Sequence, residues 1–446
     1  MASPKQSLIE ESAVLQPAAT RSATTHRGDG PIRIALFTER FLPKIDGITT
    51  RLLHTVRHLR ESGQIVLVIA PQGVTEFEGT PVHSVSGFRF PLYPDQIVAI
   101  PRPSVGRVLA EFQPDLIHTV NPACLGISAF FYSVSHQVPL IVSYHTQLAK
   151  YLRYYGMGHL ERLMWWGIRS GYNRADLTLA TSREMQIDLE NRGIRRVRLW
   201  RRGVDTRTFH PQRASWDMRV RLTEGHPEDK LLLYVGRLSA EKEIEHCRSV
   251  LAEIPGLRLA LVGDGPHRSK LEEHFAGTPT YFAGFLQGAD LAAAYASANV
   301  FFMPSRTETL GLVLLEAMAS GCPVVAAGAG GILDVVQDGL TGHLYDPADP
   351  ASAIPHIRRL LSDTSYREQM RRQARLDAEQ WSWAEATQEL ERNYRQVLLR
   401  EEELRKQIAE RAHPDATEDE LCNALQISRP TLRRHYRVPA SSERRR

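Results

Sequence analysis

Short runs of apolar residues alternate with longer amphipathic stretches along most of the chain. Such runs are typical of strands buried on both faces, and the stretches between them of helices that cover a parallel sheet. In the first half, we expect a helix over Ile48 to Arg60 and strands over 32–37, 65–70, 116–118, 140–143 and 177–179. Further strands are expected over 231–235, 257–262, 300–303 and 323–326. The pattern predicts an α/β protein.

A break in this pattern near Phe209 separates two Rossmann-like units. The 446 residues of the chain suffice for two or three domains of about 150 residues each. We expect a disordered leader over 1–30, an N-terminal Rossmann-like domain over 31–212, a C-terminal Rossmann-like domain over 213–380, a crossing helix over 381–400 and a helical tail over 401–446. Ligands of such architectures bind between the domains.

The composition is that of an ordinary soluble protein, with 42% hydrophobic and 24% charged residues. No run of about 18 apolar residues occurs, so no membrane-spanning helix is expected. The four cysteines lie far apart, without CxxC or metal-like spacing, which favours reduced thiols in a cytoplasmic protein. Residues 31–210 carry 22 Lys and Arg against 14 Asp and Glu, whereas residues 211–398 carry 19 against 25. We expect the basic first half to meet an anionic partner.

Two glutamates, Glu308 and Glu316, follow the predicted strand over 300–303. The apolar segment between them indicates a helix start, which places Glu308 in the loop and Glu316 in the first helical turns. Ligands of open α/β sheets bind at the carboxyl ends of the strands, so both carboxylates are expected to face one pocket. A charged helix start, stabilised by the helix dipole, explains the pair equally well at this point.

Glycines and cations follow other predicted strands. Gly47 comes after the first strand, where it could let backbone amides approach an anion, or simply form a strand-to-helix turn. Gly236, Arg237 and Lys242 follow the strand over 231–235. A guanidinium and an ammonium there suit a diphosphate, although such side chains are more often surface cations. Gly265 lies in another turn, where close backbone approach suits a flat base.

These segments together resemble the retaining nucleotide-sugar glycosyltransferases of family four, which have the GT-B fold. The resemblance covers residues 32–398 and rests on motifs at 235–237 with Lys242, 262–266, Glu308 with Glu316, 321–325 and 330–334. Within the family, the segments 143–146, 199–205, 275–279, 295–297 and 307–313 are similar to those of the sulfolipid synthases of cyanobacteria and chloroplasts.

This resemblance implies transfer of sulfoquinovose from UDP-sulfoquinovose to diacylglycerol. The N-terminal domain would be the acceptor and membrane domain, and the C-terminal domain would bind the nucleotide sugar. Mannosyltransferases that use GDP-mannose on lipids share most motifs, so a GDP-mannose or UDP-glucose donor with a lipid acceptor is the alternative. The UDP-sugar would be a substrate, and no cofactor is expected. No metal is expected either, because no DxD-type carboxylate pair follows a strand and two cations already face the diphosphate.

The resemblance also implies a role for each matching residue. Arg237 and Lys242 would hold the diphosphate, Glu308 would contact the sugar, and Glu316 would bind the ribose hydroxyls. His145 would lie near the reacting face of the sugar, although without the motif it is typical of a buried core histidine. Backbone positions would complete the donor site: Gly47, Gly236, Gly265, Thr309, Leu310, Gly311 and Leu312.

A diacylglycerol acceptor requires a bilayer, and two basic stretches suit an anionic membrane surface. One is the helix from Arg51 to Arg60, and the other, Lys150 to Arg174, interleaves Trp and Tyr with Arg. Either stretch could instead pack against its own sheet. We expect a cytoplasmic protein at the periphery of the inner or thylakoid membrane. Lys44 and Arg51 flank Gly47 and are the candidates for sulfonate recognition, which requires a cation or several donors.

The tail departs from the family pattern. Thr417 to Glu420 predicts a capping box, and Ser428 to Pro430 a second helix start. The segment 424–434 resembles a helix-turn-helix, with arginines on its second helix, so a nucleic-acid-binding regulator is the rival class. A nucleic-acid partner is disfavoured, because the unit has few core residues and Gln426 replaces the usual turn glycine.

Overall fold

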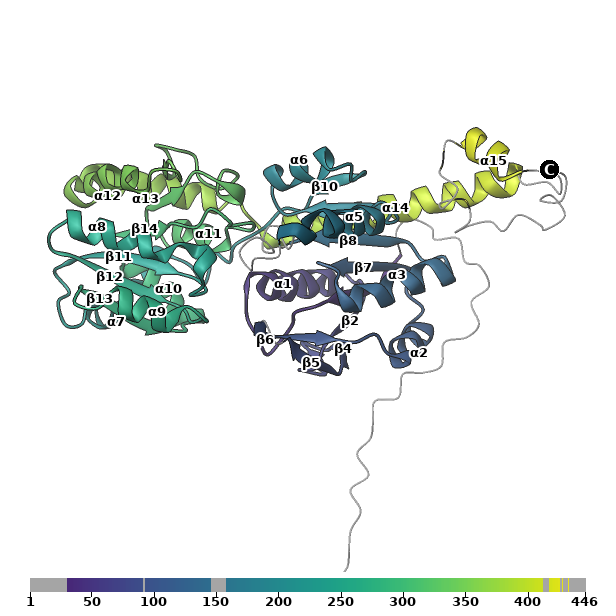
Figure 1. Ribbon diagram of the computed structural model, residues 1–446, viewed down its shortest axis with the longest axis horizontal. Helices are drawn as coiled ribbons and strands as arrows, with labels where there is room; N and C mark the ends of the chain where they lie inside the picture. The colour runs from purple at the N-terminus through teal and green to yellow at the C-terminus, as the bar shows by residue number, and fades with distance from the viewer. Residues whose placement is uncertain are drawn as a thin grey trace, which may run out of the picture.

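The computed structural model describes residues 30–90, 93–145, 158–411 and 417–425, together with residues 427 and 432. It contains two α/β domains, each built on its own sheet, and a long helix that returns from the second domain over the first (Figure 1). The predicted α/β class with two Rossmann-like domains and a helical tail is confirmed. No helix among the described residues combines the length and apolar character needed to cross a bilayer.

The first domain holds a sheet whose strands are almost all parallel. In chain order its strands are β1 (Arg33–Thr38), β2 (Ile65–Pro71), β3 (Glu76–Phe77), β4 (Thr80–Val85), β5 (Gly87–Phe90), β6 (Tyr93–Ala99), β7 (Leu116–Val120), β8 (Leu140–Tyr144), β9 (Leu177–Ala180) and β10 (Val197–Leu199). Eight of them pair in the order β10-β9-β8-β7-β1-β2-β4-β3, while β5 and β6 form a separate antiparallel ribbon. The central strands β7 and β8 are buried at every position, because helices cover both faces.

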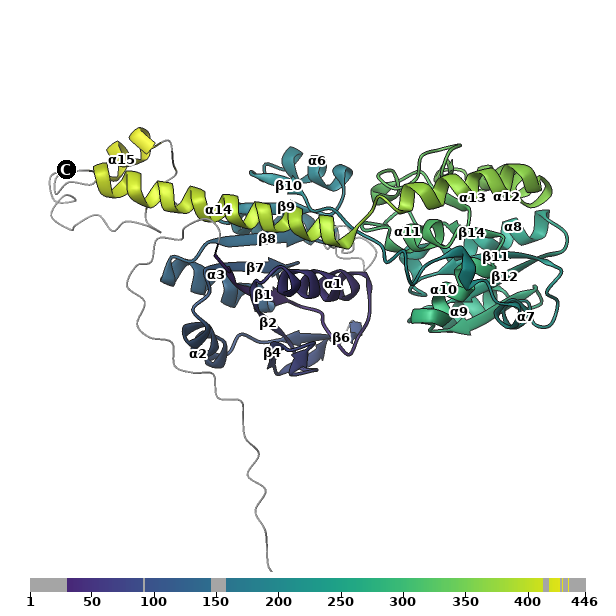
Figure 2. The same ribbon diagram turned by 180° about the vertical axis from the view of Figure 1, so that it is seen from behind.

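The helices of this domain are α1 (Gly47–Glu61), α2 (Pro103–Phe112), α3 (Cys124–His136), α5 (Glu161–Tyr172) and α6 (Arg183–Asn191). Figures 1 and 2, seen from opposite sides, show α3 and α5 over one face of the sheet and α1 over the other. The two faces have separate apolar cores. One core contains Leu125 and Ala129 of α3, and the other contains Leu52 and Val56 of α1.

The second domain repeats the design with a six-stranded parallel sheet. Its strands are β11 (Lys230–Val235), β12 (Leu257–Val262), β13 (Thr280–Gly284), β14 (Val300–Met303), β15 (Val324–Ala327) and β16 (Gly342–Tyr345), in the spatial order β13-β12-β11-β14-β15-β16. Its helices are α7 (Trp216–Leu222), α8 (Cys247–Glu253), α9 (Arg268–His274), α10 (Gly288–Ser297), α11 (Leu312–Ala319), α12 (Ala353–Ser362) and α13 (Thr364–Ala378).

Each sheet has one point at which the order of its strands reverses. In the first sheet β1 lies between β2 and β7, and in the second β11 lies between β12 and β14. Helices that leave neighbouring strands at such a point turn to opposite faces, which opens a crevice at the carboxyl ends of the strands. The loops after β1, β11 and β14 are therefore the places where each domain can bind a ligand.

The long helix α14 (Trp383–Arg411) leaves the second domain and lies along the first (Figure 2). Its residues Leu390, Tyr394 and Val397 complete the core beneath α1. The helix continues beyond the expected crossing segment and carries α15 (Glu418–Leu425) near its end.

The predicted capping box at the start of α15 is confirmed. The main-chain N–H of Thr417 donates to Oε2 of Glu420 at 2.9 Å, and the N–H of Glu420 donates to Oγ1 of Thr417 at 3.3 Å. The predicted helix start at 428–430 lies outside the described residues, as do the arginines of the proposed second helix, Arg433, Arg434 and Arg437.

Candidate functional site

An ion pair joins two loops of the second domain, at the point where the order of the strands in its sheet reverses. Lys242 ends a short 3-10 turn after β11, and its Nζ donates to Oε2 of Glu308 at 2.8 Å. Glu308 follows β14, the parallel neighbour of β11. Only 17% of the Lys242 side chain and 14% of the Glu308 side chain are exposed. The sequence placed both residues at strand ends, but it did not show that they pair.

Glu308 also binds its own loop. Its Oε1 accepts hydrogen bonds from the main-chain N–H groups of Gly311 at 3.0 Å and Leu310 at 3.3 Å. Burial raises the pKa of Glu308, but Lys242 and these N–H groups outweigh burial and lower it to about 2. The carboxylate is therefore ionised at neutral pH. In this structure it accepts from the amides of Leu310 and Gly311, and their contact with the sugar and phosphate stays a prediction.

Glycines in the loops after β11 and β12 allow these two loops to pack on each other. A Cβ on Gly236 would lie 2.8 Å from the Tyr234 hydroxyl, and a Cβ on Gly263 would overlap the carbonyl of Gly236. A Cβ on Gly265 would likewise overlap the carbonyl of Leu238. Packing against main chain thus accounts for Gly263 and Gly265, and packing against the Tyr234 side chain for Gly236. The approach of a base at Gly265 stays a prediction.

Two further glycines, Gly330 and Gly331, pack against the main chain of the Glu308 loop. The N–H of Gly331 donates to the carbonyl of Glu308 at 2.8 Å. A side chain at Gly330 or Gly331 would overlap the main-chain oxygens of Glu308 and Thr309. The position of the Glu308 carboxylate is therefore fixed through its main chain as well as through its side chain.

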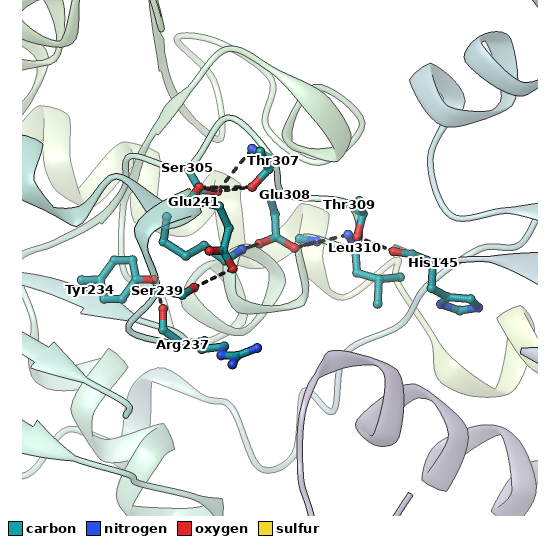
Figure 3. Close-up of polar contacts among 12 residues, drawn as sticks. His145, Tyr234, Arg237, Ser239, Glu241, Ser305, Thr307, Glu308, Thr309 and Leu310 are labelled. Carbon is teal, nitrogen blue, oxygen red and sulfur yellow. Dashed lines mark hydrogen bonds and ion pairs between the residues drawn. The ribbon is translucent and has the colours of Figure 1, made fainter. Parts of the chain in front are cut away.

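Arg237 leaves the loop after β11 on the side of the first domain. The hydroxyl of Tyr234 donates to the carbonyl of Arg237 at 3.1 Å, which fixes the main chain, and Figure 3 shows the Arg237 side chain below Glu308 in that view. Burial lowers the pKa of Arg237, Arg40 lowers it further, and Glu241 and Asp46 oppose this change. The influence of Arg40 and Asp46 places Arg237 opposite the loop that precedes α1.

Glu316 lies in α11, as predicted, and has a different partner from Glu308. Its Oε2 accepts a hydrogen bond from the Tyr295 hydroxyl at 3.0 Å. Burial raises the pKa of Glu316 to about 7, although the Tyr295 hydrogen bond acts in the opposite direction. The two glutamates therefore differ in charge state near neutral pH, because only Glu308 has a cation beside it. Their sharing of one ligand stays a prediction.

Gly47 begins α1 on the facing side of the first domain. The side chain of Asp46 caps this helix by accepting from the N–H of Thr49 at 2.9 Å, and Arg40 holds Asp46 at 3.0 Å. A Cβ on Gly47 would lie 3.6 Å from Leu310 of the second domain. The structure thus brings the predicted N-terminal glycine loop against the segment that follows Glu308.

His145 follows β8 and is buried, with 2% of its surface exposed. Its Nε2 lies 3.0 Å from Oγ of Ser143, which lies 3.2 Å from Nε2 of His118, while Nδ1 of His118 lies 2.7 Å from the Tyr394 hydroxyl. Burial lowers the pKa of both histidines, to about 3 for His118, so both are neutral. This chain links His145 to the crossing helix α14.

The direction of these hydrogen bonds depends on which atoms carry the protons. Burial raises the pKa of the Tyr394 hydroxyl, which therefore keeps its proton, and a buried hydroxyl proton needs an acceptor. The 2.7 Å contact of Tyr394 with His118 is short, as is typical of a hydroxyl donor, so we infer that Tyr394 donates to His118, His118 to Ser143, and Ser143 to Nε2 of His145. The reverse order would leave the Tyr394 proton unpaired, as this order does that of His145. This order leaves the proton of His145 on Nδ1, a buried atom without a hydrogen-bond partner in the described part of the chain.

Polar contacts tie the two domains together beside this chain. Thr309 donates from Oγ1 to the main-chain oxygen of His145 at 3.0 Å (Figure 3). Arg202, buried at the end of the first domain, donates to the carbonyl of Leu310 and pairs with Asp334 at 3.0 Å. Sequence reasoning placed Arg202 and Asp334 within motifs but gave them no role, because their partners lie more than a hundred residues away in sequence.

Of the two candidates for sulfonate recognition, Arg51 is contradicted by its position. Its side chain is fully buried, its guanidinium lies 4.1 Å from the centroid of the Trp200 ring, and Nη2 donates to the Trp200 carbonyl at 2.5 Å. It supports the loop around Trp200 and is not open to a ligand. Lys44 is exposed in the loop before α1, so its proposed role stays a prediction.

The two predicted membrane stretches differ in the same way. The helix α1 buries Leu52, Val56 and Leu59, and its Arg57 pairs with Glu78, so it packs against its own domain. The second stretch contains α5, on which Trp166 is 62% exposed. Part of that stretch, including Tyr151, Tyr154 and Tyr155, lies outside the described residues.

The described residues contain no group of three or more His, Cys, Asp or Glu side chains that could hold a metal ion. The chemical features of the site are therefore one salt-bridged carboxylate, one carboxylate with a raised pKa, and the cations Lys242 and Arg237 opposite the N-terminus of α1. Such an arrangement can bind an anion between the domains and neutralise charge that develops on it.

Comparison with known proteins agrees with this geometry. Residues 45–208 match the model of Glycosyltransferase Family 4, and residues 221–377 match that of Glycosyl transferases group 1. The sulfoquinovosyl transferase SQD2 of Arabidopsis thaliana is 40% identical over 80% of this chain and 72% of its own length. A GDP-mannose-dependent alpha-mannosyltransferase of Mycolicibacterium smegmatis is 39% identical over 73% of this chain and 87% of its own length.

Solved structures extend the likeness to the whole fold. Anabaena HepE, in complex with UDP and glucose, superposes with a TM-score of 0.67 at 21% identity, covering 81% of this chain and 99% of that chain. Sucrose-phosphate synthase of Thermosynechococcus elongatus gives a TM-score of 0.68 at 22% identity, covering 82% and 99%. The chain is a glycosyltransferase of the GT-B fold and belongs to glycosyltransferase family four.

Proposed function

We propose that this enzyme transfers sulfoquinovose from UDP-sulfoquinovose to diacylglycerol. The observation that carries the proposal is the 40% identity to the Arabidopsis sulfoquinovosyl transferase, which extends over 367 residues and therefore over both domains. His145 in one domain and the Glu308 loop in the other lie in segments by which the sequence resembles the sulfolipid synthases, and the two are in contact.

The arrangement of charges suits a UDP-sugar donor. Arg237 and Lys242 hold the diphosphate and stabilise the leaving UDP, and Glu308 orients Lys242 by the 2.8 Å ion pair. Glu316, when ionised, accepts hydrogen bonds from the ribose hydroxyls. Attack on the same face of the sugar that UDP leaves retains the configuration, and the departing phosphate oxygen takes the proton of the acceptor hydroxyl. Catalysis then consists mainly of positioning and of neutralising the leaving group.

In this proposal the reaction needs no metal or cofactor. Two side-chain cations from one loop supply the positive charge that a divalent ion would otherwise bring to the diphosphate. Activity should therefore be unchanged by EDTA, and a loss that Mg²⁺ or Mn²⁺ restores would contradict metal independence.

A GDP-mannose donor is the second candidate. Three GDP-mannose-dependent alpha-mannosyltransferases are 34–39% identical to this chain and are covered over 86–90% of their own lengths. Their similarity covers 73–82% of this chain, against 80% for the sulfoquinovosyl transferase, so the donor sugar and base decide between the two.

The test is a panel of UDP-sulfoquinovose, UDP-glucose and GDP-mannose, each supplied with diacylglycerol dispersed in detergent. Lipid products are identified by mass spectrometry, and Lys242→Ala serves as the inactive control. Product from UDP-sulfoquinovose alone is expected. Product from GDP-mannose and none from UDP-sulfoquinovose would overturn the proposal in favour of the second candidate.

In this proposal the enzyme works at the cytoplasmic periphery of a membrane that contains its acceptor. Lys44 is the remaining candidate for recognition of the sulfonate. Lys44→Ala should raise KM for UDP-sulfoquinovose and leave KM for UDP-glucose unchanged. An equal change for both donors would contradict sulfonate recognition by Lys44.

A further inference from the structure

The helix α3 lacks charged residues of either sign along its 13 residues, apart from the terminal His136. Its inner side buries Leu125 and Ala129 in the core. On its outer side Ile127, Phe131 and Val134 are 48%, 73% and 55% exposed, at the spacing that places them on one face. A surface helix normally carries charged residues on this face, so an apolar row there indicates a binding surface.

The helix α5 continues this apolar surface. Phe130 of α3 comes within 3.6 Å of the position that a Cβ on Gly171 of α5 would occupy, so the two helices are neighbours. Figure 1 shows both on the same face of the first sheet. On α5, Leu163 is 63% exposed and Trp166 is 62% exposed. The apolar residues of two adjacent helices therefore lie on one side of the first domain.

Cations surround an open pocket at the edge of this surface. The pocket has a volume of about 580 Å³ and is lined by Arg162, Trp165, Trp166, Arg169 and Arg192, with Glu161 as its one acidic residue. Arg192 lies 4.0 Å from the centroid of the Trp165 ring and pairs with Asp188. Arg162 and Arg169 have no ion-pair partner among the described residues. A pocket with aromatic walls and unpaired guanidinium groups suits a phosphate or another anion.

We propose that α3 and α5 form a docking surface for a lipid bilayer, and that the arginine-lined pocket binds the headgroup of an acidic phospholipid. The helix α3 supplies apolar residues that enter the acyl region, and α5 supplies Trp166 at the interface and arginines at headgroup level. This combination of an apolar row and cations fits an anionic membrane better than a protein partner. Residues 31–210 also carry a net positive charge, which favours association with an anionic membrane.

The position of the surface relative to the site supports this assignment. Helix α3 starts after β7 and α5 precedes β9, while His145 directly follows β8, the strand between β7 and β9. Docking through α3 and α5 therefore holds the bilayer beside the domain that contributes His145. The inference rests on the proposed lipid acceptor and is independent of which sugar is transferred.

The experiment measures binding of the full chain to sedimented vesicles in the absence of donor. Vesicles of phosphatidylcholine are compared with vesicles that also contain phosphatidylglycerol, at low and at high salt. Phe131→Asp, the double variant Ile127→Asp/Phe131→Asp and the double variant Arg162→Glu/Arg169→Glu are compared with the unsubstituted protein. The matched controls lie on α13 of the second domain: Leu376→Asp, at a site 56% exposed, and Arg372→Glu.

The unsubstituted protein and both controls should bind phosphatidylglycerol vesicles, with binding that weakens as salt rises. Phe131→Asp should lower the affinity at least about tenfold, because a Phe side chain no longer enters the acyl region. The double arginine variant should lose the preference for phosphatidylglycerol. In a parallel measurement, brominated acyl chains should quench the fluorescence of the unsubstituted protein more than that of Trp166→Phe.

Equal vesicle binding by Phe131→Asp and the unsubstituted protein would overturn the docking surface. So would a dimer in sedimentation velocity that Phe131→Asp dissociates while vesicle binding is unchanged, since the face would then be an interface between two copies. An unchanged preference for phosphatidylglycerol in the double arginine variant would overturn the headgroup pocket. Product formation from detergent-dispersed diacylglycerol without any vesicle binding would reject the surface and leave the proposed reaction intact.

Discussion

The hydroxyl of Thr309 donates a hydrogen bond to the main-chain oxygen of His145 at 3.0 Å. The donor belongs to the loop of Glu308 in the second domain, and the acceptor follows β8 of the first domain. Because the acceptor is a main-chain atom, substitution of the His145 side chain leaves it in place. The contact therefore reports on domain closure separately from the chemistry of the imidazole.

Thr309→Val keeps the shape of the side chain and removes this donor. We expect kcat/KM to fall by about tenfold, since the closed arrangement loses a hydrogen bond worth roughly 1 kcal/mol and buries an unpaired carbonyl. Thr309→Ser, which keeps the hydroxyl, should retain most of the activity. Small-angle scattering should show a broader distribution of domain separations for Thr309→Val alone. Equal kinetics for both variants would contradict the role of the hydroxyl.

Lys242→Ala should reduce kcat by about 100- to 1000-fold, because a cation that neutralises the leaving diphosphate is lost. It should also reduce the free energy of unfolding by about 3 kcal/mol, since Glu308 would be left charged and buried without its partner.

A double variant separates these two effects. Lys242→Met/Glu308→Gln replaces the charged pair by neutral side chains of similar size, so its unfolding free energy should recover, while kcat stays low. Urea unfolding and steady-state kinetics on the same preparations measure both quantities. Recovery of activity together with stability would show that the pair is only structural.

Glu316 should make donor binding depend on pH. Its pKa is raised to about 7 by burial, so the carboxylate that accepts from the ribose is fully formed only above that value. KM for the donor should fall as the pH rises over about 6 to 8, and Glu316→Gln should abolish this dependence.

Ionisation of Glu316 should also make the free energy of unfolding depend on pH, in the direction opposite to that of donor binding. The folded state holds the Glu316 proton more tightly than the unfolded state, whose pKa is near 4.5. Stability should therefore decrease as pH rises from the unfolded pKa through the folded one, by up to about 3 kcal/mol. Glu316→Gln should flatten the slope, and an unchanged slope would show that Glu316 is ionised throughout.

Tyr394→Phe should weaken catalysis from a distance. It removes the first donor of the chain through His118 and Ser143 to His145, so the proton of His145 is no longer fixed on Nδ1. We expect a fall in kcat of a few fold with little change in KM, and a changed tautomer signal for His145 in ¹⁵N NMR spectra.

The matched control is Tyr366→Phe in the second domain. The Tyr366 hydroxyl lies 2.9 Å from Nε2 of His343, so its removal also breaks a contact between a tyrosine and a histidine. Both variants should lose about 1 kcal/mol of stability, but only Tyr394→Phe should lower kcat. Equal activity of the two variants would reduce the chain to a packing feature.

Strands such as β1, β11 and β14 could be predicted from the sequence because each is a continuous apolar run buried on both faces. The edge strands β13 and β16 were not predicted. Every residue of β13 is only partly buried, and its apolar run, 281–283, is shorter than those of β11 and β14. The β5–β6 ribbon was also not predicted. Its two strands pair only with each other and belong to neither large sheet.

The site could be located from the sequence, but its contacts could not. Residues at the carboxyl ends of β11 and β14 must meet once the strands are neighbours, and Lys242 and Glu308 do so. Arg51 was misjudged because a basic residue on a helix is expected to face water, whereas here the Trp200 ring and carbonyl stabilise its buried guanidinium. The interdomain role of Arg202 depends on distant partners that no local pattern contains.

The return of α14 to the first domain has a consequence for how the protein can be divided. A fragment that stops at residue 212 would contain every strand of the first sheet and yet lack Leu390, Tyr394 and Val397, which fill the space beneath α1. Co-expression of such a fragment with the remainder should therefore rescue its solubility, whereas a circularly permuted chain that places 383–411 before residue 31 should yield a first domain that folds independently.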